Sequence, residues 1–279
     1  MTTLTSIPRA RGRPPSGKTA QSTSVQALDR ALGLLEILAD NDGLTLTDLA
    51  QRAEMAPSTA HRLLTTLQSR RFVELDEEGG RWVVGVQAFQ VGNGFVRNRK
   101  LITLGRSIMR RLMEQCGETV NLGIVDEGEV VFVSQFESHA PMRAFFRPGK
   151  RGPIHASGIG KALMSTWSKE QVHQVLKIKG LKQFTDKTIT DQKALFSELK
   201  KVRERGWSVD DQEHTLGMRC IAAPIFNEYA EAAAGISISG PSVRLPDETI
   251  LEFGPEVRRA ADEISRSIGG DLSSGSDAI

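Results

Sequence analysis

Cysteine and aromatic residues are scarce in this chain, and long hydrophobic runs are absent. Its 279 residues include two cysteines, Cys116 and Cys220, and Phe, Trp and Tyr together make up 5%. Two cysteines cannot build a disulfide framework, so the sequence indicates a reducing compartment such as the cytoplasm. No apolar run approaches the roughly 18 residues of a membrane helix, and the polar N-terminus lacks the core of a secretion signal. We therefore expect a cytoplasmic protein with no membrane partner.

The charge of the chain is nearly balanced but unevenly placed. The 36 basic and 34 acidic residues leave a net charge of +2, which is not that of a polybasic protein. Residues 1–24, however, carry four basic residues and no acidic one. This segment is rich in Thr, Ser and Pro and shows no hydrophobic periodicity, so we expect a disordered basic arm.

Residues 25–88 show the pattern of three short helices followed by a hairpin. The apolar residues recur at helical spacing in three segments, which are residues 25–39, 46–53 and 57–67. Pro57 suits the first turn of the third helix. Two apolar strands flanking residues 76–80 predict a hairpin. This order is typical of a winged helix-turn-helix domain.

The third predicted helix has one face suited to DNA. Its outward side chains are short and polar, and no acid occurs between Pro57 and Arg71. Such side chains reach phosphate oxygens and base edges in a major groove. In the arm, the segment from Arg11 to Pro14 resembles an AT-hook, whose arginines enter a narrow minor groove. The predicted DNA contacts are Arg11, Arg13, Ser58, Thr59, His61, Arg62 and Thr65. The alternative is a small helical bundle with a solvated third helix, but the co-occurrence of these features favours DNA binding.

A second domain with a mixed pattern follows. We expect a linker containing Gly92 and Gly94 and a connecting helix over 89–116, a folded domain over 117–270 and a disordered tail over 271–279. Its predicted strands are 120–125, 130–135, 143–146, 207–210, 220–226 and 233–239. Its predicted helices are 157–167, 192–205 and 248–268. The interleaved order predicts an α+β fold.

These segments resemble the IclR family of bacterial transcription regulators. Segment 25–32 is similar to the family's first helix, 56–64 to its recognition helix and 153–163 to a motif of its second domain. Further similar segments are 210–214, 217–224 and 236–241. The resemblance covers roughly 24–270. It implies an α+β chain with an N-terminal winged helix-turn-helix domain and a C-terminal GAF-like effector-binding domain, whose antiparallel sheet is flanked by helices. It also implies homodimers that often pair into homotetramers.

The likeness is strongest to the allantoin-pathway repressor branch, which responds to glyoxylate. It is carried by segments 89–92, 97–99, 180–185 and 237–242. The resemblance implies an effector pocket made of Ser157, Gly158, Ile159, Asp210, Cys220, Ser237, Ile238 and Ser239. Ile159 departs from the branch, which tends to have a small residue there, and its larger side chain would narrow the pocket.

The chemistry of these residues suits a small carboxylate. Ser157 can cap a helix whose first backbone amides attract an anion. Asp210 would repel an anion, unless it faces the other end of the ligand, where the hydroxyls of a hydrated carbonyl can donate to it. Ser237 and Ser239 lie two apart on a strand and share one face. The alternative interpretations are simple helix capping and an ordinary polar strand face.

Cys220 has three candidate roles. It could be a nucleophile activated by His155 or His214, which would make the chain an enzyme, or a metal ligand with Asp210, Glu213 or His214. A lone cysteine beside a strand is most often a small buried hydrophobe. The sequence has no compact ligand spacing such as CxxC, so we expect no catalytic residue, no metal and no cofactor. Cys116 is expected in the core.

The sequence therefore predicts a DNA-binding transcriptional regulator and not an enzyme. We expect a repressor of allantoin- or glyoxylate-type catabolic genes that binds double-stranded operator DNA. A small carboxylate, with glyoxylate as first choice, is its expected effector. One alternative is an activator of aromatic-acid or sugar-acid catabolism. Another, of a different class, is a Cys-dependent enzyme fused to a DNA-binding domain.

Overall fold

The computed structural model describes residues 25–272 apart from 77, 98 and 99. The arm with Arg11 and Arg13, and residues 273–279 of the expected tail, lie outside the described residues. The chain divides into two compact units, Met1–Gly94 and Phe95–Ile279. Among the described residues, no helix is both long and apolar enough to cross a membrane.

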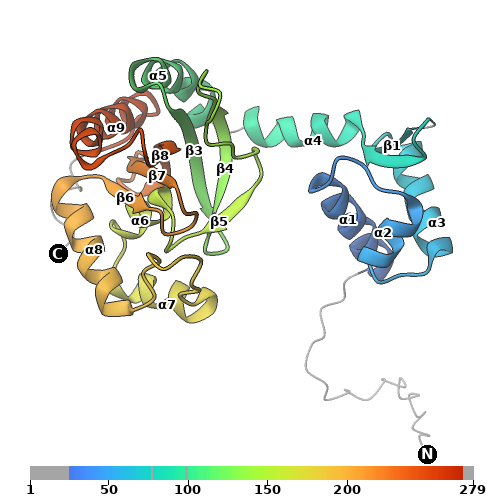
Figure 1. Cartoon of the computed structure of the whole chain (residues 1–279). Helices are drawn as coiled ribbons and strands as arrows, with labels where there is room; N and C mark the ends of the chain where they lie inside the picture. The colour runs from blue at the N-terminus through green and yellow to red at the C-terminus, as the bar shows by residue number, and fades with distance from the viewer. Residues whose placement is uncertain (1–24, 77, 98–99, 273–279) are drawn as a thin grey trace, which may run out of the picture. The chain divides into compact units, whose positions relative to one another are not determined.

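The first unit is a three-helix bundle with a hairpin. Its elements are α1 (Gln26–Ala39), α2 (Leu46–Arg52), α3 (Pro57–Ser69), β1 (Val73–Asp76) and β2 (Arg81–Val84) (Figure 1). The Thr45 side chain caps α2 by accepting the Asp48 N–H at 3.2 Å. Leu34, Leu49 and Leu64, one from each helix, pack with Trp82 of the hairpin in one core. The predicted winged helix-turn-helix fold is confirmed.

The glycine-containing segment after the hairpin is a helix, where the sequence suggested a linker. Helix α4 (Val86–Arg97) runs through Gly92 and Gly94, and α5 (Lys100–Cys116) follows it. Each glycine costs a helix about 1 kcal/mol relative to alanine. The apolar residues around these glycines keep a helical spacing, which explains why the helix continues.

The second unit is built on an antiparallel sheet. Its strands are β3 (Thr119–Asp126), β4 (Glu129–Phe136), β5 (Arg151–Pro153), β6 (Ser208–Asp211), β7 (Met218–Phe226) and β8 (Ala232–Pro241). The spatial order is β5-β4-β3-β8-β7-β6. Strand β8 therefore pairs with a neighbour along both edges, with Ser239 opposite Thr119 on β3 and opposite Cys220 on β7.

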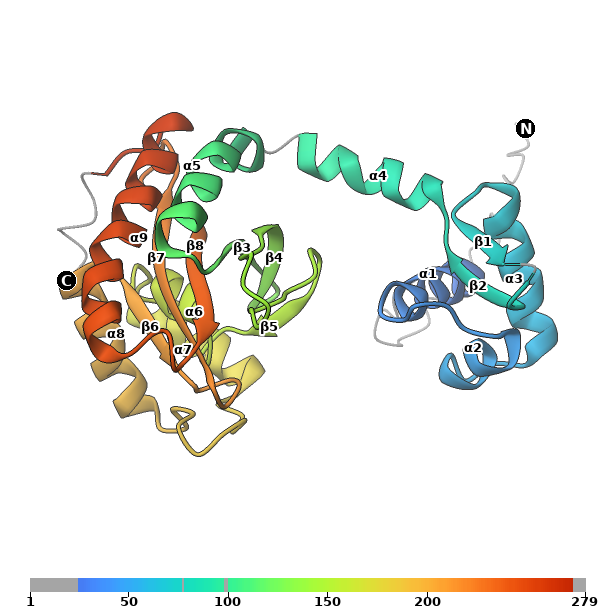
Figure 2. The ribbon, with the colours of Figure 1, turned by 45° about the horizontal axis from the view of Figure 1, so that its top comes forward.

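Helices cover both faces of this sheet (Figures 1 and 2). One face carries α5 and α9 (Asp247–Ser267), whose apolar residues share a core with Ile221, Ile236 and Ile238 of the strands. The other face carries α6 (Gly158–Met164), α7 (Lys169–Lys179) and α8 (Gln192–Arg205) over a second core. This layering confirms the α+β prediction.

One predicted strand is wrong and two elements were not predicted. Residues 143–146 form no strand and have irregular backbone, and Phe146 stacks on Phe132 of β4 at 4.6 Å between ring centroids. The edge position is taken by β5, three residues long. The missed helix α7 begins at the capping box formed by Ser168 and Gln171.

Candidate functional site

A small cavity lies where the start of α6 meets strands β6, β7 and β8. Its volume is about 30 Å³, counted as the space open to the centre of a water molecule. Seven of the eight predicted effector residues line it, and these are Ser157, Gly158, Ile159, Asp210, Cys220, Ser237 and Ser239. Segments that lie far apart in the sequence thus meet at one point of the fold.

The structure corrects the prediction for Ile238. Successive side chains of a strand point to opposite faces of the sheet. Ser237 and Ser239 face the cavity, and Ile238 between them is fully buried in the core under α5 and α9. Its side chain cannot contact a ligand in this cavity.

The first turn of α6 forms one wall of the cavity. The Ser157 hydroxyl accepts a hydrogen bond from the Gly160 N–H at 3.1 Å. The N–H groups of Gly158 and Ile159 belong to a first turn, which has no partners inside its own helix. A Cβ atom at Gly160 would collide with the carbonyl group of Ile154, so the turn requires glycine there.

Ile159 occupies a hollow in the sheet. Gly123 of β3 and Gly235 of β8 are directly paired. A Cβ atom at Gly235 would lie 2.8 Å from Cγ2 of Ile159, and one at Gly123 would lie 3.1 Å from its Cδ1. The two glycines therefore make room for the isoleucine, so part of its extra bulk is accommodated by the sheet.

Asp210 is the acidic residue of the cavity wall. It is 6% exposed, and its Oδ1 accepts the Glu213 N–H at 2.8 Å. Burial raises the pKa of Asp210 to about 7, and the positive charge of Lys161 opposes this rise. Near neutral pH the Asp210 carboxyl is therefore partly protonated and can both donate and accept hydrogen bonds.

Cys220 is held in a chain of polar contacts. Its Sγ lies 2.9 Å from the Ser239 hydroxyl, which also accepts from Nδ2 of Asn121 at 3.2 Å. Burial, and then the charge of Asp210, raise the pKa of the Cys220 thiol far above its usual range. A thiol that stays protonated is a poor nucleophile. In the described part of the chain, no group of three or more His, Cys, Asp or Glu side chains could hold a metal ion.

Several lining residues were not predicted from the sequence. They are Phe132, Phe146, Lys150, Arg151, Gly152, Pro153 and His214, of which the sequence suggested only His214, and only as a partner of Cys220. Most lie on β5 or just before it. The basic run around Lys150, placed immediately before the motif that contains Ser157, is the sequence signal that could have identified this wall.

In the first unit, α3 presents the polar face expected of it. Ser58, His61, Arg62 and Thr65 are exposed and Thr59 is half-buried. The Thr65 hydroxyl donates to the His61 carbonyl at 2.8 Å, which leaves its lone pairs outward. Ahead of α3, Glu54 adopts a left-handed conformation with φ of 48° in the tight turn from α2.

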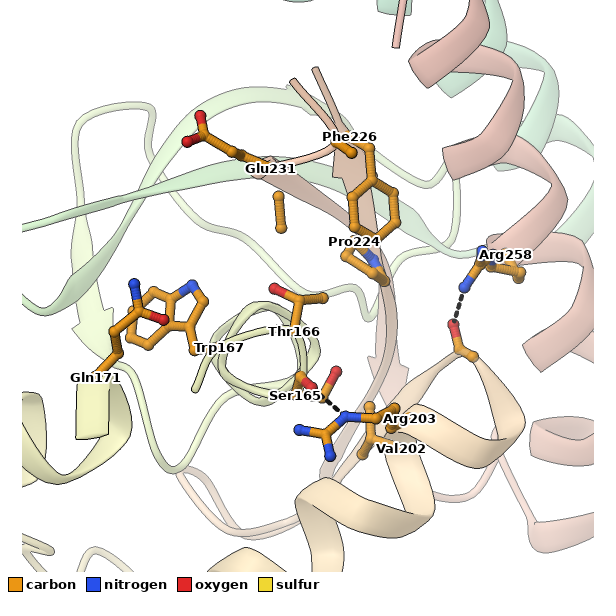
Figure 3. Close-up of a pocket in the computed structure, with 13 residues that line it drawn as sticks. Ser165, Thr166, Trp167, Gln171, Val202, Arg203, Pro224, Phe226, Glu231 and Arg258 are labelled. Carbon is orange, nitrogen blue, oxygen red and sulfur yellow. Dashed lines mark hydrogen bonds between the residues drawn. The ribbon is translucent and has the colours of Figure 1, made fainter. Parts of the chain in front are cut away.

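A larger cavity of about 380 Å³ lies elsewhere in the second unit (Figure 3). It contains none of the predicted site residues. Its two arginines bind carbonyl groups where helices end: Nε of Arg203 donates to Ser165 at 2.8 Å, and Nη1 of Arg258 donates to Gly206 at 3.3 Å. These bonds satisfy carbonyl groups at the C-terminal ends of α6 and α8, so the arginines have a structural role.

Both units match known protein families. Residues 27–77 match the IclR helix-turn-helix domain, and residues 94–266 match the family described as bacterial transcriptional regulator IclR C-terminal. The chain is 48% identical to the HTH-type transcriptional regulator BhcR of Paracoccus denitrificans, over 92% of each protein. It is 44% identical to the transcriptional repressor IclR of Escherichia coli, over 95% of this chain and 98% of that one.

The finer placement in the allantoin branch is supported only in part. The Escherichia coli repressor AllR is 37% identical, over 94% of this chain and 97% of that protein. This sequence identity is lower than the identities to BhcR and IclR. Among solved structures, Thermotoga maritima IclR superposes with a TM-score of 0.75 at 28% identity. That match covers 88% of this chain and all of the other.

Proposed function

This chain belongs to the IclR family of DNA-binding transcriptional regulators, and from that premise we propose that it is a repressor released from its operator by a small carboxylate. The observation that carries the proposal is the cavity at the start of α6, which gathers seven predicted effector residues from four segments of the second unit. IclR and AllR are both named as repressors, which favours repression over activation.

We propose α3 as the helix that reads the operator. Its exposed face offers hydroxyl, imidazole and guanidinium groups without a carboxylate. Arg62 lies near the middle of that face and can contact guanine with two hydrogen bonds. The arm over residues 1–24 adds Arg11 and Arg13 as candidates for the minor groove.

We propose glyoxylate as the effector. A cavity of about 30 Å³ selects for a ligand of few atoms. The ligand carboxylate would lie on the amides of Ser157, Gly158 and Ile159. Its hydrated carbonyl would lie near Asp210 and the Cys220–Ser239 pair, whose hydroxyl and thiol groups can exchange hydrogen bonds with a diol. The regulated genes would then be catabolic genes of the allantoin or glyoxylate type.

The test is calorimetric titration of glyoxylate and pyruvate into the wild type and Asp210→Ala. We expect the wild type to bind glyoxylate and release operator DNA. Asp210→Ala should lose the response to glyoxylate but keep operator binding without effector, because α3 lies in the other unit. If the wild type binds neither acid, the ligand is wrong. If Asp210→Ala responds like the wild type, the assigned pocket geometry is wrong.

A further inference from the structure

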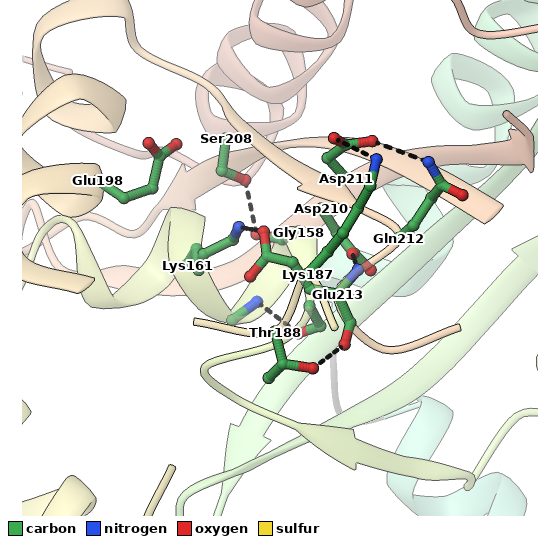
Figure 4. A network of polar contacts seen from close by, with 12 residues as sticks. Gly158, Lys161, Lys187, Thr188, Glu198, Ser208, Asp210, Asp211, Gln212 and Glu213 are labelled. Atoms are coloured by element: carbon green, nitrogen blue, oxygen red, sulfur yellow. Dashed lines mark hydrogen bonds and ion pairs between the residues drawn. The ribbon is translucent and has the colours of Figure 1, made fainter. Parts of the chain in front are cut away.

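A cluster of buried charges lies behind the cavity wall (Figure 4). Lys161 of α6 forms an ion pair with Oε1 of Glu213, and the two side chains are 1% and 7% exposed. The other carboxylate oxygen, Oε2 of Glu213, is buried and has no hydrogen-bond partner among the described residues. The backbone N–H of Glu213 in turn binds Asp210, which joins the cluster to the cavity.

This cluster contains one cation and two carboxyl groups. The other charged groups nearby do not balance the second carboxyl. Arg151 on β5 is paired with Asp126 and Glu129. Lys150 beside it also lines the cavity, but it is exposed to solvent, which screens its charge. Burial lowers the pKa of His155 and of His214, which favours their neutral forms. Glu198 of α8 adds negative charge toward Glu213 and is itself paired with Arg205.

The neighbouring carboxylate Asp211 faces away from this cluster. It is bound by Arg219 and by Lys187, the latter at 3.0 Å. The remaining group facing Asp210 is the Cys220 thiol on β7, which is neutral. With both carboxyls ionised, the buried cluster would carry one unbalanced negative charge, and such a charge is costly to bury. An anionic ligand would add a second negative charge beside it.

We infer that an anionic effector enters this cavity together with one proton, which is held on the buried carboxyl pair Asp210 and Glu213. The inference rests on the proposed effector site and adds the charge balance of that site. The proton comes from solvent. Asp210, which faces the ligand, is then neutral, and Lys161 balances the Glu213 carboxylate. Burial raises the pKa of both carboxyls in the free protein, which prepares the pair for this uptake.

The coupling predicts a dependence of affinity on pH. When binding takes up one proton, affinity falls by up to about tenfold for each pH unit above the pKa of the free site. Calorimetric titration of glyoxylate into the full chain measures the number of protons taken up, when it is repeated at each pH in buffers of different ionisation enthalpy. We expect an uptake between zero and one that rises from pH 6 to pH 8.5, with weakening affinity.

Two variants make the test specific. In Asp210→Asn the group facing the ligand is always neutral, so affinity should no longer change with pH. Asp211→Asn removes a neighbouring carboxylate whose pKa is held far below this range by Arg219, and it should keep the pH dependence of the wild type. If glyoxylate binds without proton uptake and with the same affinity at every pH, the proton coupling is wrong but the proposed ligand stands. Failure of the wild type to bind glyoxylate and pyruvate would overturn the ligand as well.

A measurement without ligand probes the same pair. The folded-state pKa of Asp210 lies above its unfolded value, so its contribution to stability is complete below about pH 4 and is lost as pH rises through about 7. The melting temperature of the wild type should therefore fall relative to Asp210→Asn between pH 5.5 and 8.5. A constant difference between the two proteins would show that burial does not raise the pKa of Asp210 in the free protein, and it would contradict the pH range given above for the proton uptake.

Discussion

Arg62 is the residue on which the proposed operator reading depends most. It is exposed near the middle of the acid-free face of α3. Arg62→Ala should weaken specific operator binding by about 1–3 kcal/mol and flatten the preference at one base position. Quantitative footprinting on the operator and on single-base variants measures both effects. Lys200→Ala, which removes an exposed positive charge from α8, is the matched control and should leave both unchanged.

Gly235 and Gly105 offer a second test at the residue scale. A Cβ atom at Gly235 would press against Ile159, whereas one at Gly105 in α5 would meet Ile264 at an ordinary 3.5 Å. Gly235→Ala should therefore destabilise the second unit by about 1–3 kcal/mol through overpacking. Gly105→Ala should stabilise it by about 0.5–1 kcal/mol, because alanine suits a helix interior. If the two substitutions changed the stability to thermal unfolding equally, the fit of Ile159 into the sheet would be contradicted.

The two cysteines should be slow to react in the folded protein. Burial raises the pKa of Cys116 to about 11 and that of Cys220 further, so few thiolates are present at pH 8. Alkylation by iodoacetamide, followed by mass spectrometry, should modify both residues only after unfolding. Rapid modification of Cys220 in the native state would restore it as a candidate nucleophile.

At the scale of elements, local signals explain which predictions succeeded. Helix α8 was predicted with its observed bounds, because Asp191 caps its start and Gly206 ends it in a left-handed conformation. Strand β5 was missed because three residues carry no alternation. Residues 143–146 were mistaken for a strand because their apolar pattern comes from packing of Phe146 on Phe132 and not from a ladder.

The predicted site shows the same division between local and tertiary information. The family motifs identified seven residues of the cavity, and the spacing of Ser237 and Ser239 placed both on one face. That same alternation excludes Ile238, which motif resemblance alone had included. The Lys161–Glu213 pair could not be predicted, because 52 residues separate its partners and only the fold brings them together.

The basic arm is the element whose role in DNA binding can be tested by deletion. Removing residues 1–20 takes away Arg9, Arg11, Arg13 and Lys18. We expect weaker DNA binding and a shallower dependence of log K on log salt, by about 0.9 for each phosphate that the arm neutralises. Binding isotherms at several salt concentrations measure the slope. Identical slopes for the two forms would show that the arm binds no phosphate.

At the scale of the whole molecule, we expect assembly. Helix α4 exposes Val86, Phe89 and Val91, and apolar residues of this size are commonly covered by a partner. A dimer in solution and a tetramer on an inverted-repeat operator are the expected states. Light scattering of the free protein and of its DNA complex measures both. A monomer in both conditions would contradict the prediction.

The double pairing of β8 limits how the second unit can respond to a ligand. A shift of this strand would break hydrogen bonds to β3 and β7 together, and it would move Ile236 and Ile238 out of the opposite core. The cavity is bordered on another side by β5, a three-residue strand paired along one edge to β4. Amide hydrogens of β8 should therefore exchange slowly with or without effector, while those around β5 should become protected when the effector binds.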